Sequence, residues 1–388
     1  MASDSVTGPA RYQPICKDQR HAAGPLTHGA TDMTTSIADM LRRSLILFTS
    51  LALIGTSTSA NAASGLCFRG INLSGAEYGD RNGAADTNYV YPAEATVHYF
   101  AGKGMNVIRL PFLWERLQPV LNQGLDSGEL TRLVAAVDSI HKNGMAVILD
   151  PHNYAHYDKV QISQAPVTDM AFGDFWARLA VEFANQPGVI FGLMNEPNDI
   201  KAPDWLAAAN TAIRSIRSVG ARNLILVPGT IWTGAHSWSE DRLGGGSNAT
   251  VMLGVKDPLN FYAYEVHQYL DSDSSGTHAT CEGADKARTG LVDVTNWLRQ
   301  NHRKGFLGEF GAAANQPCLD GLQKMIDVMG GSSDVWLGWT YWAAGDWWPE
   351  SEPFNVQPRK TPERPQMKLL ETAARNQRMA KACSTSIK

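Results

Sequence analysis

From Gly65 onward, short apolar runs alternate with amphipathic stretches in a regular order. Eight of the apolar runs have the length and composition of buried strands: Cys67–Leu73, Met105–Leu110, Ala146–Asp150, Val189–Met194, Leu224–Pro228, Phe261–His267, Gly305–Glu309 and Trp336–Trp342. Five stretches between them have a helical period: Glu129–Asn143, Phe172–Asn185, Trp205–Val219, Gly290–His302 and Leu319–Met329. Eight strand–helix units predict an α/β protein with a single-domain (β/α)8 TIM barrel. A doubly wound sheet fits less well, because no G-x-G-x-x-G follows the first strand.

The N-terminal residues 1–62 are expected to be an extension plus a secretory signal peptide, which leaves residues 63–388 as the mature domain. Two arginines precede an apolar run from Leu45 to Gly55, and small residues follow up to Ala62. This order is typical of a signal peptide cleaved after its last small residue. The run is too short to cross a membrane. We therefore expect a secreted protein, cleaved near Ala62, with no membrane association.

The overall charge limits the kind of partner that the chain can bind. The formal net charge is -4 and the isoelectric point is near 6.2. A nucleic-acid partner would require a basic face, whereas a neutral polysaccharide would not. Nothing in the sequence indicates an oligomer, so a monomer is expected.

The cysteines agree with export to an oxidising compartment. Cys16 lies in the predicted leader, and four cysteines remain in the mature chain. Four cysteines allow three connectivities. We favour Cys67–Cys383, near the two ends of the domain, and Cys281–Cys318, on either side of the seventh predicted strand. A zinc site is the alternative, but no Cys-x2-Cys or paired histidine spacing supports it.

Two short motifs each place a glutamate at the end of a predicted strand. They are Leu193-Met-Asn-Glu-Pro-Asn198, with Glu196, and Leu307-Gly-Glu-Phe-Gly311, with Glu309. In a (β/α)8 barrel the carboxyl ends of the strands carry the catalytic residues. Cleavage of a glycosidic bond requires a pair of carboxyl groups, which these two glutamates would supply.

Further motifs give the chain a specific resemblance. Phe68-Arg-Gly-Ile-Asn-Leu-Ser-Gly-Ala-Glu77 covers the first strand, Trp232-Thr-Gly-Ala-His-Ser-Trp238 follows the fifth, and Gly338-Trp-Thr-Tyr-Trp-Ala-Ala-Gly345 covers the eighth. With the two glutamate motifs in order, the chain resembles the endo-β-1,4-glucanases (cellulases) of glycoside hydrolase family 5. The resemblance extends from about Gly65 to Ala374. It implies a β-glucan substrate, a retaining double displacement that cleaves internal bonds, and no cofactor or metal.

The resemblance also implies roles for single residues. Glu196 would be the general acid/base and Glu309 the nucleophile, kept ionised by Arg109. Asn195 would bind the sugar 2-hydroxyl. Four further residues resemble family members that line the cleaved bond: His152, His267, Tyr269 and Trp342. Glu77, Asp150 and Glu265 are interpreted as partners of these groups, not as catalysts.

Several tryptophans in loops beyond the strand ends are candidate platforms for sugar rings, because pyranose faces stack on aromatic side chains. They are Trp114, Trp232, Trp238, Trp347 and Trp348. Trp347 and Trp348 are the strongest candidates because they follow the last strand. Packing within the loops is the alternative, and we expect it for at least one of the five. Trp297 and Trp336 are expected in the core.

Other functions remain open at this stage. A β-mannanase, a mixed-linkage glucanase or a xyloglucanase would share both glutamates and differ in loop contacts. A non-catalytic carbohydrate-binding barrel would usually have lost one carboxylate. A metal-dependent hydrolase could be imagined around His152 and His267, but their spacing matches no metal motif.

Overall fold

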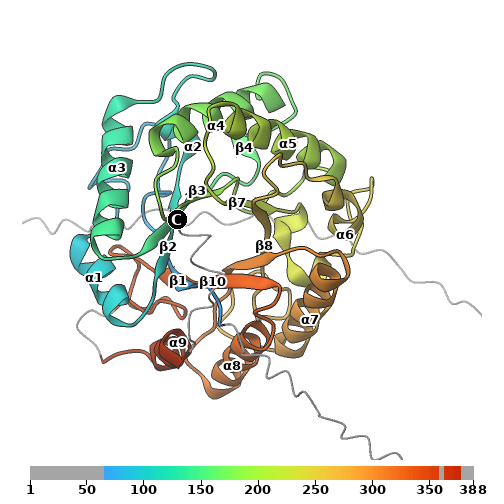
Figure 1. Ribbon diagram of the computed structural model, residues 1–388. Coiled ribbons are helices and arrows are strands. Elements are labelled where there is room, and N and C mark those ends of the chain that lie inside the picture. Colours follow the sequence, from blue (N-terminus) through green and yellow to red (C-terminus); the bar gives the residue numbers. More distant parts are fainter. Residues whose placement is uncertain (1–64, 358–361, 377–388) are drawn as a thin grey trace, which may run out of the picture. The chain divides into compact units, whose positions relative to one another are not determined.

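The computed structural model of the protein describes residues 65–357 and 362–376. Its centre is a closed barrel of eight parallel strands (Figure 1). In chain order these are β1 (Phe68–Leu73), β2 (Val107–Phe112), β3 (Ala146–Pro151), β6 (Val189–Gly192), β7 (Ile225–Pro228), β8 (Tyr262–His267), β9 (Gly305–Glu309) and β10 (Trp336–Ala344). Each strand pairs with the next, and β10 closes the barrel against β1. The predicted (β/α)8 fold is confirmed.

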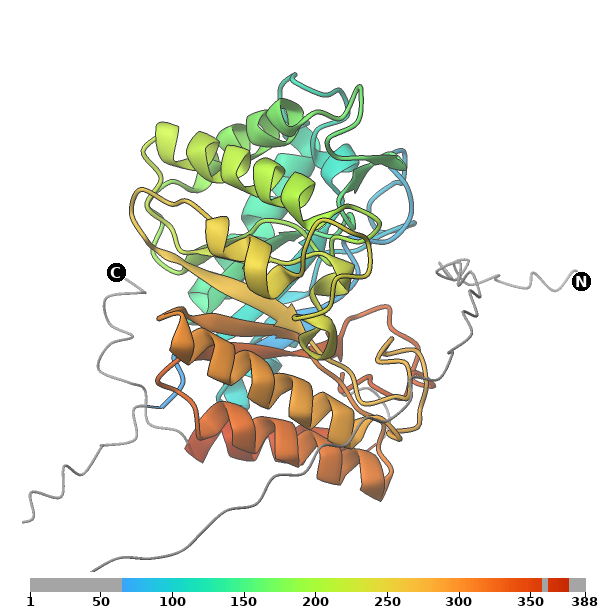
Figure 2. The ribbon, with the colours of Figure 1, turned by 90° about the vertical axis from the view of Figure 1, so that its right-hand side faces the viewer.

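Helices surround the barrel and connect its strands (Figure 1). They are α1 (Glu94–Gly102), α2 (Trp114–Leu117), α3 (Ser127–Lys142), α4 (Asp169–Phe183), α5 (Ala202–Ser218), α6 (Asn248–Val251), α7 (Ala284–Gln300), α8 (Gln316–Gly330) and α9 (Pro365–Asn376). The neighbouring helices α7 and α8 lie side by side along the outside of the sheet (Figure 2). The described helices do not include one long and apolar enough to cross a membrane.

All eight predicted strands are present, with ends displaced by at most two residues. The helix starts differ more, and in α3, α4 and α8 a side-chain cap and not apolar periodicity sets the start. Asp126 accepts a hydrogen bond from the backbone of Glu129 and starts α3 two residues before the prediction. Thr168 caps Ala171 in the same way and starts α4 three residues early. The prediction missed α1, α2, α6, α9 and the hairpin of β4 (His156–Tyr157) and β5 (Val160–Gln161).

The side chains that point into the barrel form two layers. Near the amino ends, interior side chains such as Phe68, Val107 and Phe306 form an apolar cluster. Successive side chains of a strand point to opposite faces, so residues two positions further along face the interior again. In β2 that position is Arg109, and in β8 Glu265 follows the apolar Ala263. The same strands therefore carry an apolar floor and, above it, a buried polar layer.

One predicted disulfide is confirmed: Cys281 and Cys318 are bonded, with a sulfur–sulfur distance of 2.02 Å. It joins the segment before α7 to the first turn of α8. Cys383, the predicted partner of Cys67, lies outside the described residues, as do the predicted leader and its cleavage site. That second pairing and the domain boundaries stay predictions.

Candidate active site

Arg109 in β2 organises the polar layer at the carboxyl ends of the strands. Its guanidinium group is completely buried and contacts three carboxylates, at 2.8 Å for Glu309, 2.9 Å for Glu265 and 3.1 Å for Asp150. Its Nη2 also donates to Asn195 Oδ1 at 2.9 Å. A buried cation requires this many acceptors, because an unpaired charge away from water is very costly. Four barrel strands and the loop after β6 are thereby fixed around one side chain.

Glu309, the last residue of β9, lies in surroundings that favour its ionised form. Arg109 Nη1 donates to Oε1 at 2.8 Å, and the Tyr269 hydroxyl donates to Oε2 at 2.7 Å. Burial raises the pKa of this carboxyl, but the positive charges of His267 and Arg109 outweigh burial and hold its pKa below the ordinary value. Glu309 is therefore a carboxylate held in a fixed orientation.

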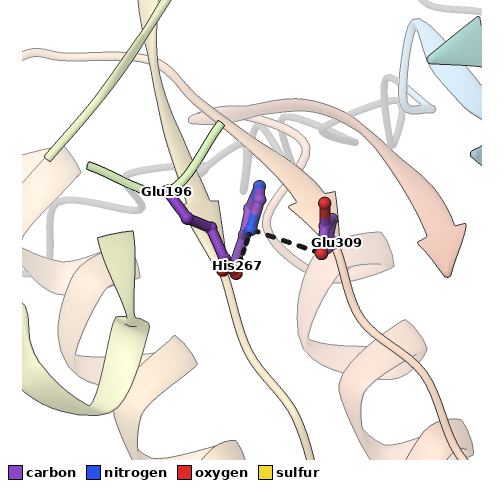
Figure 3. A group of neighbouring side chains, drawn as sticks. All are labelled: Glu196, His267 and Glu309. Carbon is purple, nitrogen blue, oxygen red and sulfur yellow. Dashed lines mark hydrogen bonds and ion pairs between the residues drawn. The ribbon is translucent and has the colours of Figure 1, made fainter. Parts of the chain in front are cut away.

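Glu196 lies in the loop after β6 with a backbone φ of 39°, a left-handed conformation that a glutamate rarely adopts. The surrounding loop fixes this backbone, and the side chain extends toward the centre of the site (Figure 3). Its Oε1 lies 2.8 Å from His267 Nδ1. Burial and the nearby Glu309 raise its pKa above the ordinary value, although His267 acts in the opposite direction. Glu196 is thus the carboxyl of the pair that holds a proton more readily.

His267 connects the two glutamates, with Nδ1 2.8 Å from Glu196 and 3.6 Å from Glu309 (Figure 3). Burial lowers the pKa of this imidazole, but the surrounding carboxylates, Glu309 first among them, raise it to about 10. One oxygen or nitrogen atom from each of these three residues lies within 4.8 Å of the others, a spacing that could hold a metal ion. We assign no metal to this group, because the Arg109 guanidinium already pairs with Glu309 and would repel a second cation beside it.

A second possible metal group, Asp271, Asp273 and His278, lies in the loop after β8. Asp271 is buried, and its two oxygens accept backbone N–H groups from Gly276 and Thr277. These oxygens therefore hold the loop in its shape, and we assign no metal to it.

His152 and Asn195 form the opposite wall of the site. His152 lies 2.8 Å from Asp150 through Nδ1 and 3.1 Å from Asn195 through Nε2. Since Asn195 accepts from Arg109 with its oxygen, its amide nitrogen faces the imidazole, and His152 Nε2 acts as the acceptor. The imidazole also stacks on Trp342, with ring centres 5.5 Å apart and an angle of 15°. The structure thus brings together all eight predicted polar and aromatic residues of the inner site: Arg109, His152, Asn195, Glu196, His267, Tyr269, Glu309 and Trp342.

The outer tryptophans differ in exposure. Trp232 is 46% exposed and begins a loop beside the acid/base candidate, with its backbone N–H donating to Pro197 at 3.0 Å. Trp348 packs edge-to-face on Trp342, with ring centres 5.8 Å apart. Trp347 is half-buried. These three remain candidate sugar contacts.

Two of the predicted platforms are wrong. Trp238 is 1% exposed and packs edge-to-face between Tyr264 and Trp297. Trp114 is completely buried among aromatic side chains of the outer core, including Phe175. Both residues follow strand ends in the sequence, but their side chains point away from the site. They contribute to packing and not to sugar binding.

Two residues of the site were not predicted from the sequence. Asn72, in β1, accepts from Arg109 Nη1 at 3.0 Å and donates to the backbone oxygen of Gly308 at 2.9 Å. Tyr154, with a positive φ of 54°, packs edge-to-face on His152. Burial and the nearby Glu196 raise the Tyr154 pKa well above its ordinary value. A polar residue in an apolar strand was the available signal for Asn72, and closeness in the sequence to the predicted site residue His152 was the signal for Tyr154.

This geometry defines a class of enzyme. An ionised carboxylate lies close to a second carboxyl that can hold a proton, at the carboxyl ends of the strands of a (β/α)8 barrel. That arrangement is typical of glycoside hydrolases.

Comparison with known proteins identifies the family. Residues 65–345 match the model of the family described as cellulase (glycosyl hydrolase family 5). The chain belongs to this family and is a glycoside hydrolase.

Individual relatives agree with this membership. An endo-β-1,4-glucanase from Xanthomonas axonopodis pv. citri is 50% identical, with a TM-score of 0.77, over 79% of this chain and 99% of that chain. XacCel5A, solved in complex with cellopentaose, has the same identity, TM-score and coverage. Endo-β-1,4-glucanase A of Emericella nidulans is 38% identical over 321 residues, which are 81% of this chain and 93% of the relative.

Proposed function

We propose that the chain is a retaining endo-β-1,4-glucanase, in which Glu309 is the nucleophile and Glu196 the general acid/base. The observation that carries the proposal is the spacing of the two carboxyls, with an oxygen of each within 4.8 Å of the other. Retaining enzymes have carboxyls about 5–5.5 Å apart, whereas inverting enzymes need about 6.5–9.5 Å to admit a water molecule.

In the first step Glu309 attacks the anomeric carbon of the glucose unit at the cleaved bond. The new bond joins this carbon to a Glu309 oxygen, while the bond from the carbon to the leaving chain's oxygen breaks. The proton of Glu196 moves to that oxygen, so the shortened chain leaves as an alcohol. Arg109 and Tyr269 orient the nucleophile by holding one oxygen each.

In the second step water attacks the same carbon. Its oxygen bonds to the carbon as the ester bond to Glu309 breaks, and its proton returns to Glu196. The nucleophile is then a carboxylate again, and the acid is restored. Asn195 is held between Arg109 and His152, in a position suited to the sugar 2-hydroxyl, a contact that strengthens in the transition state.

The substrate part of the proposal rests on the relatives, several of which are named endo-β-1,4-glucanases, and on the cellopentaose complex of XacCel5A. The half-exposed Trp232 fits such a chain, because an aromatic face can stack on a glucose unit. An extracellular location is part of the proposal, since the Cys281–Cys318 disulfide is typical of oxidising compartments. We expect the enzyme to act as a monomer without a cofactor.

The experiment measures viscosity and reducing ends together on a soluble β-1,4-glucan. It compares residues 63–388 with the variants Glu196→Gln and Glu309→Gln, and follows the anomer of the first product by NMR. The parent is expected to lower the viscosity steeply before many ends appear and to release the β-anomer. Both variants should lose this activity.

Other outcomes separate the parts of the proposal. Cleavage of mannan or xyloglucan in place of glucan would leave the mechanism standing and overturn the substrate. Release of the α-anomer would overturn retention. Full activity in either variant would overturn the assignment of the two glutamates.

A further inference from the structure

Glu265 is a third glutamate in the polar layer, and the two chemical steps do not use it. It lies in β8, 1% exposed, two residues before His267, so both side chains point into the barrel. Its Oε1 accepts from Arg109 Nε at 2.9 Å and lies 3.3 Å from His267 Nε2. Its Oε2 is buried without a hydrogen-bond partner among the described residues. Its negative charge is therefore only partly compensated.

The neighbouring strand leaves space for this contact. A Cβ atom at Gly308 would lie 2.2 Å from Glu265 Oε1 and 2.8 Å from His267 Nε2. Any side chain at this position would separate the carboxylate from the imidazole. The glycine directly before Glu309 is thus required by the Glu265–His267 pair.

His267 is surrounded by charges from several elements. Glu265 from its own strand faces Nε2, while Glu196, after β6, and Glu309, at the end of β9, face Nδ1. Arg109 from β2 is bonded to Glu265 and Glu309 and partly offsets them. Burial opposes ionisation of Glu265, but Arg109 and His267 hold its pKa below the ordinary value, so Glu265 is a carboxylate. Of the three acids, it is the only one whose charge the proposed reaction does not change.

The charge on Glu309 disappears during the reaction. In the proposed glycosyl-enzyme intermediate this residue is an ester, and its carboxylate is the largest single contribution that keeps His267 protonated. Glu196 must be a carboxylate at the same stage, ready to accept a proton from water. A cationic His267 stabilises that carboxylate, whereas a neutral imidazole would not.

We propose that Glu265 is a positioning residue that keeps His267 cationic, with Nδ1–H directed at Glu196, while the nucleophile is esterified. The inference rests on the proposed retaining function and deepens it. The attacking water can then approach the other carboxylate oxygen of Glu196, because the protonated His267 ring is bonded to Oε1. Glu265 acts through His267 and does not contact the sugar. Its contribution falls on the second step, the hydrolysis of the intermediate.

The first test uses Glu265→Gln, which keeps an acceptor for Arg109 and His267 but removes the charge. The substrate is 2,4-dinitrophenyl β-cellobioside, whose leaving group needs no acid, so that kcat reports the second step. We expect the variant's His267 to lose its proton in the intermediate at neutral pH, so that kcat falls about ten-fold or more while kcat/KM falls much less. The alkaline limb of the kcat profile should move to lower pH.

The matched control is Asp150→Asn. It removes a carboxylate from the same guanidinium group without touching His267. It should lower kcat and kcat/KM together and leave the alkaline limb of kcat in place. If Glu265→Gln behaves like this control, Glu265 only supports Arg109 and the inference is wrong.

A second measurement needs no variant of Glu265 and decides the question if Glu265→Gln does not fold. The parent is trapped with 2,4-dinitrophenyl 2-deoxy-2-fluoro-β-cellobioside, and ¹⁵N NMR reports the ring nitrogens of His267 at pH 7. Both nitrogens should carry protons in the free and the trapped enzyme. A neutral ring in the trapped enzyme would overturn the inference. The absence of any covalent adduct on Glu309 would instead overturn the proposed function.

Discussion

The two layers inside the barrel are equally buried and opposite in character. Phe68 in the floor and Arg109 in the polar layer are exposed by 1% and 0%, on adjacent strands. The floor gains free energy from removing apolar surface from water, and any well-packed apolar set would serve. The polar layer gains nothing in this way. It is stable only because Arg109 pairs with three of the buried carboxylates at hydrogen-bond distance.

Stability and activity depend differently on the two layers of this fold. A barrel interior filled entirely like the floor would be at least as stable. The polar layer retains buried carboxylates because the charges around the two glutamates shift their pKa values in opposite directions. Changes to the floor should therefore affect folding alone, and changes to the polar layer should affect both folding and activity.

The largest effect is expected for Arg109→Met. The variant leaves three carboxylates without their cation, so we expect a loss of about 3–5 kcal/mol in the free energy of unfolding. Activity should be lost as well, because Glu309 no longer has a donor that keeps it ionised and oriented. Urea unfolding and hydrolysis of soluble glucan measure the two effects.

Arg217→Met is the matched control. Arg217, in α5, forms a buried pair with Asp257 at 2.9 Å, and neither residue contacts the site. This variant should lose stability and keep kcat/KM. Equal loss of activity in the two variants would mean that activity depends on overall stability and not on the polar layer.

Phe68→Ala tests the floor. Truncation of a buried aromatic side chain costs about 3–5 kcal/mol, and the ring of Phe306, 6.3 Å away, would lose a partner. Below the unfolding transition, kcat/KM should stay within about two-fold of the parent, because the sites of chemistry are supported by their own hydrogen bonds. A large fall in kcat with unchanged stability would show that the two layers are coupled.

The sequence predicts the fold well because buried strands are apolar runs, and eight of them in order leave few alternatives. It also places Glu196 and Glu309, since each stands in a recognisable motif at a strand end. It fails for Trp114 and Trp238, because position in a loop does not tell which way a side chain points. Asn72 was missed because its partner Arg109 is on another strand, and only barrel closure brings the two together.

The stability of the protein should depend on pH through the titration of His267 in the polar layer. The folded-state pKa of His267 is about 10 and the ordinary value 6.5, so its contribution to stability is complete below pH 6.5. It is then lost progressively as the pH rises to about 10. We expect the melting temperature of the parent to fall over this range. In His267→Asn the fall should be clearly smaller, and an equally steep fall would show that other groups cause it.

The smallest effect is expected at the outer edge of the site, where Trp232→Ala removes a half-exposed ring. Stacking of one aromatic ring contributes about 0.5–1.5 kcal/mol, so KM for a soluble glucan should rise roughly two- to ten-fold, with little change in the melting temperature. Trp238→Ala is its counterpart six residues along the same loop. It removes a buried ring between Tyr264 and Trp297, so it should lower the melting temperature strongly. If the two variants gave the same pattern, exposure would not distinguish a sugar contact from a packing residue in this loop. A different residue would then have to hold the glucan beyond Glu196.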